Sequence, residues 1–217
     1  MVYLRSILAD DQERMLDILT SDTVKQTYML PDFPDRDAAL PLFRRLMEMC
    51  NDRTKYVRAI AVDDCLVGFL NHTEITVDSI ELGYVIHPDS QNRGYMTQAL
   101  KLAMEELFSL GYRQIITGAF STNAASIRVM EKCGMERMEK TDAIEYRGIN
   151  HTCVYYSVRT IAYNCCFCGK TAMPRDAYTL SVRRSHDPDG PEQEIYCHRV
   201  CLERNLADPK LLYLKYM

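Results

Sequence analysis

The chain has 217 residues, of which 47% are hydrophobic and 26% are charged. This balance is typical of a globular protein and excludes disorder, collagen or a coiled coil as a description of the whole chain. The formal net charge of −4 does not by itself attract nucleic acid or anionic lipid. No apolar run approaches the roughly 18 residues that a membrane span needs. We therefore expect a soluble, cytoplasmic protein made of one domain and an appendage.

The first 160 residues alternate between patterns typical of strands and patterns typical of helices. Asn123 is a candidate helix N-cap, and Gly111 and Gly134 stand where glycine commonly ends a helix. Strands interleaved with helices indicate an α/β or α+β layered fold around a mixed sheet. In chain order, the patterns predict a strand at 3–8, helices at 9–19 and 37–50, strands at 55–62, 65–76 and 80–87, a helix at 97–110, a strand at 113–119, a helix at 123–133, and strands at 135–143 and 152–158.

The composition changes near residues 159–164, and this change predicts two domains, 1–160 and 161–217. Nine cysteines are many for a cytoplasmic protein, and five of them lie in the second domain. A reducing compartment disfavours disulfides, so the clustered cysteines indicate a metal site.

A loop at 85–97 joins a predicted strand directly to the long helix at 97–110. The free amides at a helix start favour anions, and Gly94 lets the backbone approach a ligand closely. Arg93 adds a positive charge and Thr97 a hydroxyl. The loop is therefore a candidate pyrophosphate site, with an ordinary helix start as the alternative.

Four motifs follow one another in the sequence: LGYVIHP at 82–88, QxxGxM at 91–96, NAAS at 123–126 and EKCGM at 131–135. With an amphipathic helix between the second and the third, their order and spacing resemble the GNAT acetyltransferase superfamily. The resemblance is greatest to the RimJ/RimL-like branch, the ribosomal-protein-alanine N-acetyltransferases. It covers about residues 1–160 and implies a mixed, mostly antiparallel central sheet flanked by helices.

The resemblance implies that acetyl-CoA is the cosubstrate. In this family the loop amides hold the pyrophosphate, strand backbone pairs with the pantetheine arm, and an asparagine contacts the pantetheine or the acyl end. Met96 departs from the family pattern, which usually has Gly or Ala there, and Asn92 stands where many members have Gly. The residues that the resemblance assigns to cofactor binding are Val85, Ile86, Gln91, Asn92, Arg93, Gly94, Tyr95, Met96, Thr97 and Asn123.

The resemblance also suggests catalytic residues. Many members carry a tyrosine acid before the Glu-Lys-x-Gly segment, but Met130 occupies that position here. The RimL-like branch instead uses a serine that is thought to protonate the leaving thiolate, and Ser126 matches it. The same branch has a glutamate 19 residues further on that is proposed as the base, and Glu145 lies at that spacing. Glu81, on the central predicted strand, is an alternative base that would act through water.

The last 57 residues carry a metal-knuckle pattern, Cys165-x-x-Cys168-Gly169, in which the glycine permits a tight turn. A hairpin with strands at 177–183 and 194–196 and a turn at 187–190 is predicted next, and a short helix follows from about His198. Together these features resemble a treble-clef zinc finger. The expected ligands of a structural, tetrahedral Zn²⁺ are Cys165, Cys168, His198 and Cys201, with Cys197 as the alternative to His198.

The expected function is an acetyl-CoA-dependent N-acetyltransferase that transfers an acetyl group by direct attack of a primary amine. The amine belongs to a protein N-terminus or to a small molecule, and Tyr84 and Tyr146 are candidates to line its pocket. The alternative is a non-catalytic acyl-CoA-binding or protein-binding module that retains the fold. The zinc module would pack on the first domain, pair subunits in a homodimer or recognise a protein. Nucleic acid is not an expected partner, because basic and acidic residues balance over 170–199.

Overall fold

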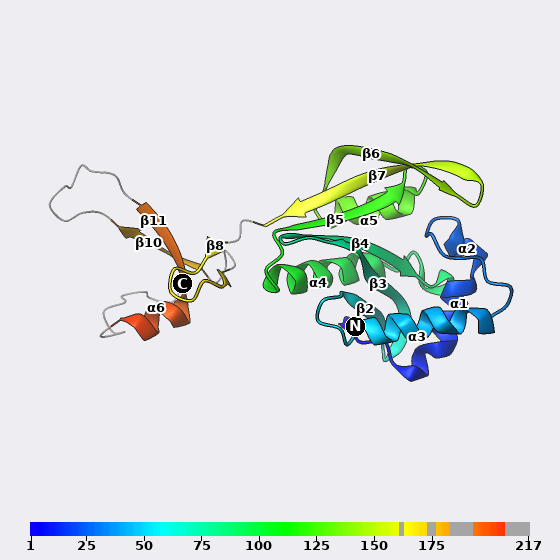
Figure 1. Ribbon diagram of the computed structural model, residues 1–217, viewed down its shortest axis with the longest axis horizontal. Coiled ribbons are helices and arrows are strands. Elements are labelled where there is room, and N and C mark those ends of the chain that lie inside the picture. The colour runs from blue at the N-terminus through cyan, green and yellow to red at the C-terminus, as the bar shows by residue number, and fades with distance from the viewer. Residues whose placement is uncertain (161–162, 173–176, 183–192, 207–217) are drawn as a thin grey trace. The chain divides into compact units, whose positions relative to one another are not determined.

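The computed structural model describes residues 1–160, 163–172, 177–182 and 193–206, and the chain divides into two compact units (Figure 1). The first unit comprises Met1–Leu107 and Gln114–Arg159. The second comprises Phe108–Arg113 and the described residues from Thr160 onward. Phe108–Arg113 belongs to the second unit, where the Arg113 carbonyl accepts a hydrogen bond from the Thr160 N–H at 3.1 Å.

The first unit is built on one seven-stranded sheet with the strand order β1-β2-β3-β4-β5-β7-β6. All neighbouring strands run antiparallel except β4 and β5, which are parallel. The predicted mixed, mostly antiparallel sheet is therefore confirmed. The strands are β1 (Val2–Arg5), β2 (Val57–Val62), β3 (Cys65–Ile75), β4 (Ser79–Ile86), β5 (Gln114–Phe120), β6 (Glu136–Tyr146) and β7 (Ile149–Arg159).

Helices pack against this sheet, and their starts differ from the sequence prediction in two places. The helix predicted at 9–19 begins as a 3₁₀ turn, and so does the one predicted at 37–50, where a proline occupies the first turn of the α-helix. A one-turn helix closed by the Ser21 side chain was not predicted, because a single turn shows no periodicity. The α-helices are α1 (Gln12–Thr20), α2 (Asp22–Lys25), α3 (Leu40–Met49), α4 (Tyr95–Ser109) and α5 (Ala124–Lys132), and the 3₁₀ helices are η1 (Ala9–Asp11), η2 (Asp37–Ala39) and η3 (Pro88–Ser90).

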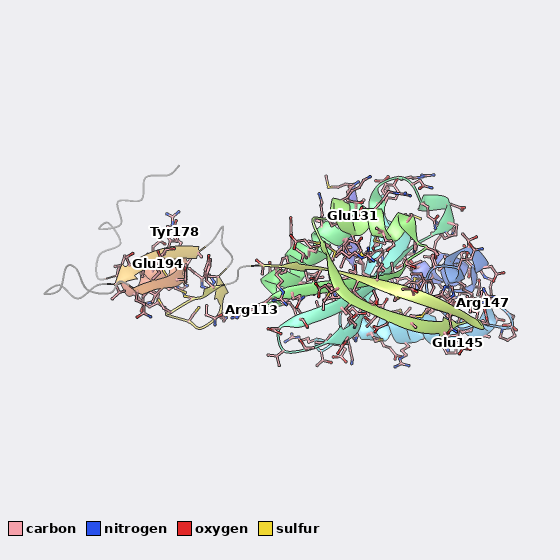
Figure 2. The ribbon with its side chains drawn as sticks, turned by 90° about the horizontal axis from the view of Figure 1, so that it is seen from above. Arg113, Glu131, Glu145, Arg147, Tyr178 and Glu194 are labelled. Carbon is pink, nitrogen blue, oxygen red and sulfur yellow. The ribbon has the colours of Figure 1, made fainter. Side chains whose placement is uncertain are left out.

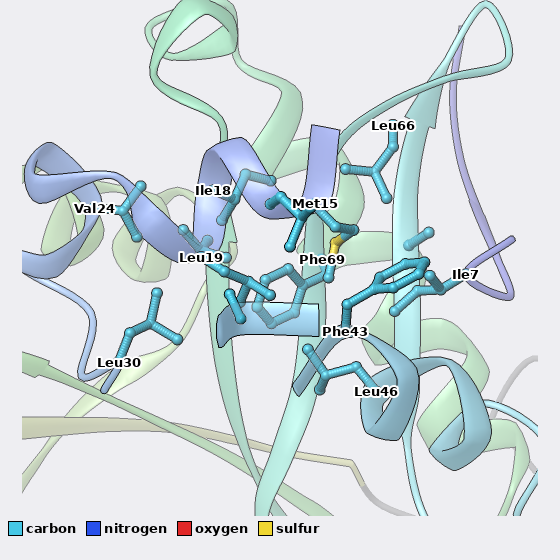
Figure 3. Close-up of a cluster of buried hydrophobic side chains, with 14 of the residues drawn as sticks. Ile7, Met15, Ile18, Leu19, Val24, Leu30, Phe43, Leu46, Leu66 and Phe69 are labelled. Atoms are coloured by element: carbon cyan, nitrogen blue, oxygen red, sulfur yellow. The ribbon is translucent and has the colours of Figure 1, made fainter. Parts of the chain in front are cut away.

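A hydrophobic cluster joins α1 and α3 to β2 and β3 (Figure 3). Phe69 of β3 is 1% exposed and packs edge-on against the Tyr28 ring, with the ring centroids 5.9 Å apart. Phe43 and Leu46 bring the apolar face of α3 into the same cluster, as the predicted helical periodicity requires. This core holds β3 in place, and β3 in turn pairs with β4, the strand on which the candidate site is built.

The second unit contains small β elements and one short helix. A two-residue hairpin formed by β8 and β9 was not predicted, because strands this short show no alternation. The hairpin predicted farther along the chain is present as β10 and β11, while its predicted turn at 187–190 lies outside the described residues. No helix among the described residues is long and apolar enough to cross a membrane. The elements are β8 (Tyr163–Asn164), β9 (Thr171–Ala172), β10 (Ala177–Val182), β11 (Gln193–His198) and α6 (Arg199–Asn205).

Candidate active site and Cys/His cluster

A cavity of about 750 Å³ opens where β4 and β5 separate. The paired residues of these parallel strands run from Ser79 and Gln114 to Leu82 and Thr117, and no later pair is formed. Residues 83–86 of β4 still pair with β3 on their other side. This stretch, called here the β4 edge, therefore presents backbone polar groups to the cavity without a strand partner. Such an edge can hydrogen-bond an extended ligand in the manner of an added strand.

The β4 edge leads through η3 into the 91–97 loop, which also lines the cavity. Gly94 has φ +74° and Asn92 has φ +60°, so both residues take the left-handed conformation that glycine and asparagine tolerate best. The Gly94 carbonyl accepts from the Gln98 N–H at 3.2 Å and so begins the hydrogen bonding of α4. The first-turn N–H groups that follow have no acceptor within the helix. Met96 is only 7% exposed, so its side chain packs into the protein.

Three basic side chains line the cavity near this loop: Arg93, Arg128 and Lys132. All three are exposed, and none forms an ion pair within the described part of the chain. Free cations beside a helix N-terminus suit a ligand that carries several phosphate groups.

A pair of hydroxyl groups lies on the cavity wall between β4 and α5. Asn123 caps α5 by accepting the Ser126 N–H at 3.1 Å, and this cap fixes Ser126 in the first turn of the helix. The Ser126 Oγ is then 2.7 Å from the Tyr84 hydroxyl. Burial raises the pKa of Tyr84 to about 12, so this phenol stays protonated at neutral pH.

The structure does not bring Glu145 to the cavity. Its side chain is exposed near the tip of the β6–β7 hairpin, whereas the preceding Ile144 lines the cavity (Figure 2). The reason is the alternation of side chains along a strand, which turns Glu145 to the face opposite that of Ile144 and Tyr146. The expectation that Glu145 lies beside Ser126 is therefore corrected. Glu81 lines the cavity instead, and its carboxylate accepts the Thr73 hydroxyl at 2.9 Å.

Met130 also stays away from the reacting region. It is fully buried, and its sulfur accepts a hydrogen bond from the hydroxyl of Thr117, which is itself fully buried. The helix position at which many family members carry a tyrosine acid therefore packs into the core.

Sequence reasoning missed the wall at the far end of the cavity. Tyr28 follows α2, and its buried hydroxyl donates to the Asn71 side chain on β3. Tyr146, from the tip of the β6–β7 hairpin, accepts the Leu30 N–H at 3.2 Å and donates to the Leu30 carbonyl at 3.0 Å. Arg147 of the same tip forms an ion pair with Asp32 at 3.2 Å. The alternation of Asn71 and Thr73 on one face of β3 was the signal available in the sequence.

In the second unit, the four predicted metal ligands lie together. The sulfurs of Cys165, Cys168 and Cys201 and a ring nitrogen of His198 all lie within 4.8 Å of one another. Cys197 is fully buried, and its sulfur lies 3.8 Å from the Tyr178 carbonyl oxygen. Burial raises the pKa of the Cys165 thiol, but backbone N–H donors, first among them that of His198, outweigh this effect and hold the pKa below its usual range.

A sequence-family model described as "Acetyltransferase (GNAT) domain" matches residues 2–136, more than half of the chain. Among curated proteins, the "Uncharacterized N-acetyltransferase YnaD" of Bacillus subtilis (strain 168) is 34% identical over 77 residues. These residues are 35% of this chain and 45% of that protein. The chain thus matches less than half the length of this curated relative.

Solved structures with RimL-like and other acetyltransferase folds are similar to the first unit. One is the acetyltransferase of Salmonella typhimurium that modifies the N-terminal serine of 50S ribosomal subunit protein L7/L12; it is 15% identical with a TM-score of 0.63, over 73% of this chain and 94% of that chain. Another is the microcin C7 self-immunity acetyltransferase MccE in complex with acetyl-CoA and AMP; it is also 15% identical, with a TM-score of 0.64, over 73% of this chain and 92% of that chain. At these identities the likeness establishes the fold alone. The family match, which covers more than half of the sequence, shows that the chain belongs to the GNAT acetyltransferase family.

Proposed function

We propose that the protein is an N-acetyltransferase that uses acetyl-CoA and a primary amine. The observation that carries the proposal is the continuity of three features along one cavity. An unpaired β4 edge runs into a left-handed loop, and the loop opens onto the first turn of α4. An extended arm that ends in a pyrophosphate complements this series of backbone groups.

In this proposal the backbone of Val85 and Ile86 pairs with the pantetheine arm. The amides of residues 91–97 receive the pyrophosphate, and the three free cations of the cavity balance the phosphate charge. Asn123 keeps its role as the cap of α5 and thereby places the adjacent hydroxyl pair at the acyl end of the site.

The reaction is a direct attack of the amine nitrogen on the thioester carbonyl, so a C–N bond forms while the C–S bond breaks. We assign Glu81 to accept the proton lost by the attacking amine, through a water molecule, because its carboxylate lines the cavity. Ser126 gives its proton to the leaving thiolate and is reprotonated by Tyr84 across their 2.7 Å hydrogen bond. Tyr84 regains its proton from solvent.

We assign the acceptor to primary amines of a protein N-terminus or of a small molecule. The cavity carboxylate of Glu81 favours an acceptor that arrives as a cation. The Salmonella typhimurium relative, which modifies a protein N-terminal serine, supports the first class. Zn²⁺ takes no part in this transfer, and a structural role in the second unit is the role that its Cys and His residues support.

The first test is a calorimetric titration of the purified chain with acetyl-CoA, followed by thiol-release assays with a panel of N-terminal peptides and small amines. Binding below about 1 mM together with turnover supports the proposal. Binding without turnover on any acceptor favours the non-catalytic acyl-CoA-binding alternative, for which the buried Met130 in place of a tyrosine acid is the motivating observation. Absence of binding refutes both.

The matched pair Glu81→Gln and Glu145→Gln tests the choice of base. Each change removes one carboxylate charge with little change of shape, but only the first lies in the cavity. We expect Glu81→Gln to lower kcat by about 10²–10⁴-fold and Glu145→Gln to leave kcat near the wild-type value. The reverse result would assign the base to Glu145.

A further inference from the structure

We propose that the second unit binds one structural Zn²⁺ through Cys165 Sγ, Cys168 Sγ, His198 Nδ1 and Cys201 Sγ. Zinc bonds of about 2.3 Å to sulfur and about 2.0–2.1 Å to nitrogen, at tetrahedral angles, give S···N edges of about 3.5 Å and S···S edges of about 3.8 Å. The Nδ1 of His198 lies 3.5 Å from Cys168 Sγ and 3.7 Å from Cys201 Sγ. The widest separation within the cluster, 4.8 Å at most, exceeds such an edge by only about 1 Å.

The fold brings these ligands together from two places in the chain. The first pair lies on a tight turn after β8, in which the Gly169 N–H donates to the Cys165 carbonyl at 2.8 Å. Gly169 has φ +71°, a conformation that glycine adopts without strain. The second pair lies where β11 gives way to α6, with His198 as the N-cap residue and Cys201 within the first turn.

Contacts between the two pairs hold the site together. The His198 N–H donates to Cys165 Sγ at 3.5 Å, and the Cys166 N–H donates to the Tyr196 carbonyl at 2.8 Å. Backbone N–H donors to a ligating sulfur stabilise its thiolate form, the form that binds zinc. The knuckle and the end of β11 are therefore in register for a shared ion.

The two remaining cysteines of the unit are not ligands. Cys197 alternates with His198 along β11, so its side chain takes the opposite face, and it is packed in a small apolar cluster with Leu202. Cys166 lies between the knuckle cysteines but is exposed and outside the group of four. This distinction selects His198 over Cys197 and supplies Cys166 as a matched control.

The small core of this unit explains why a metal is needed. Its buried apolar side chains among the described residues are Cys165, Ala172, Cys197 and Leu202. A unit with so little buried apolar surface commonly depends on a metal or disulfides for stability. Four protein ligands complete a tetrahedral zinc shell, so the ion has no open position for a substrate and its role is structural.

The experiment is elemental analysis of the purified full-length chain, combined with Co²⁺ substitution followed by absorption spectroscopy. We expect about one Zn per chain, and we expect Co²⁺ to give the d–d and thiolate charge-transfer bands of a tetrahedral thiolate-rich site. Cys168→Ser and Cys201→Ser should weaken zinc binding by more than the roughly 10–100-fold that loss of an outer-shell contact costs. Cys166→Ser should keep the full zinc content.

Three outcomes would overturn the proposal. One is a wild-type chain that carries no zinc and takes up no Co²⁺. Another is a Cys166→Ser variant that loses as much zinc as Cys168→Ser. The third is a disulfide between cluster cysteines, found by mass analysis without reductant. The Co²⁺ spectrum of the wild-type chain keeps the proposal testable even if a ligand variant fails to fold.

Discussion

Replacing Gly94 by alanine tests whether the left-handed loop is part of the acetyl-CoA site. A Cβ added at Gly94 would have no heavy atom within 4 Å, so the change causes no clash, but φ +74° is unfavourable for any residue with a side chain. The cost of that conformation is about 1–2 kcal/mol. Because the loop is exposed, the backbone of the Gly94→Ala variant can relax when no ligand is bound, and the ligand must then restore the strained turn. We therefore expect the calorimetric Kd for acetyl-CoA to rise by about 5–30-fold.

Gly134→Ala is the matched control. Gly134 has φ +76°, also has no atom within 4 Å of a built Cβ, and does not line the cavity. Its strain should therefore lower only the stability, by the same 1–2 kcal/mol or about 2–8 °C in Tm, and leave the Kd unchanged. An unchanged Kd for Gly94→Ala, or an equal rise for both variants, would refute the reasoning that phosphate binding depends on this turn.

Three further changes probe the hydroxyl pair and the sheet beneath it. Ser126→Ala should lower kcat by about 10²–10⁴-fold, and in steady-state assays Tyr84→Phe added to it should cost little more, because the two hydroxyls act as one relay; fully multiplicative losses would contradict the relay. The pKa of Tyr84 is raised to about 12, so the stability that its protonated form contributes is fully present below pH 10 and is lost as the pH rises through about 12. Tyr84→Phe should therefore flatten the alkaline fall of Tm, and an unchanged profile would argue against a buried phenol. A Cβ at Gly68 would lie 2.2 Å from the Val85 carbonyl oxygen, so Gly68→Ala should destabilise the fold by about 1–3 kcal/mol or more in denaturant unfolding, and a neutral result would mean that β3 and β4 are farther apart.

The elements of the first unit and the start of the cofactor loop were predictable from local signals. Asn123 caps α5 as expected, and Gly94 stands where the chain turns into α4. The tight turn at residues 63–64 was also local, since both aspartates take positive φ. Capping, glycine and alternation act within a few residues, so a single sequence carries them.

The catalytic geometry was less accessible, because it depends on contacts between distant residues. Tyr84 and Ser126 are 42 positions apart, and only the separation of β4 from β5 brings their hydroxyls together. A spacing rule pointed to Glu145, but a spacing does not state which face of a strand a residue takes. Strand β6 extends to Tyr146 and turns tightly at Arg147, and this register places Glu145 outside the cavity.

The contact between the β6–β7 hairpin tip and the segment after α2 has a consequence for how acceptor preference can change. Tyr146 and Leu30 are 116 positions apart, yet their hydrogen bonds close the wall at the far end of the cavity. Neither residue belongs to the β4 edge or to the 91–97 loop. Substitutions or insertions on this wall can therefore reshape the space for an amine while the cofactor half of the cavity keeps its geometry. The site is divided into a half that can remain constant and a half that can vary, which allows one fold to serve different acceptors.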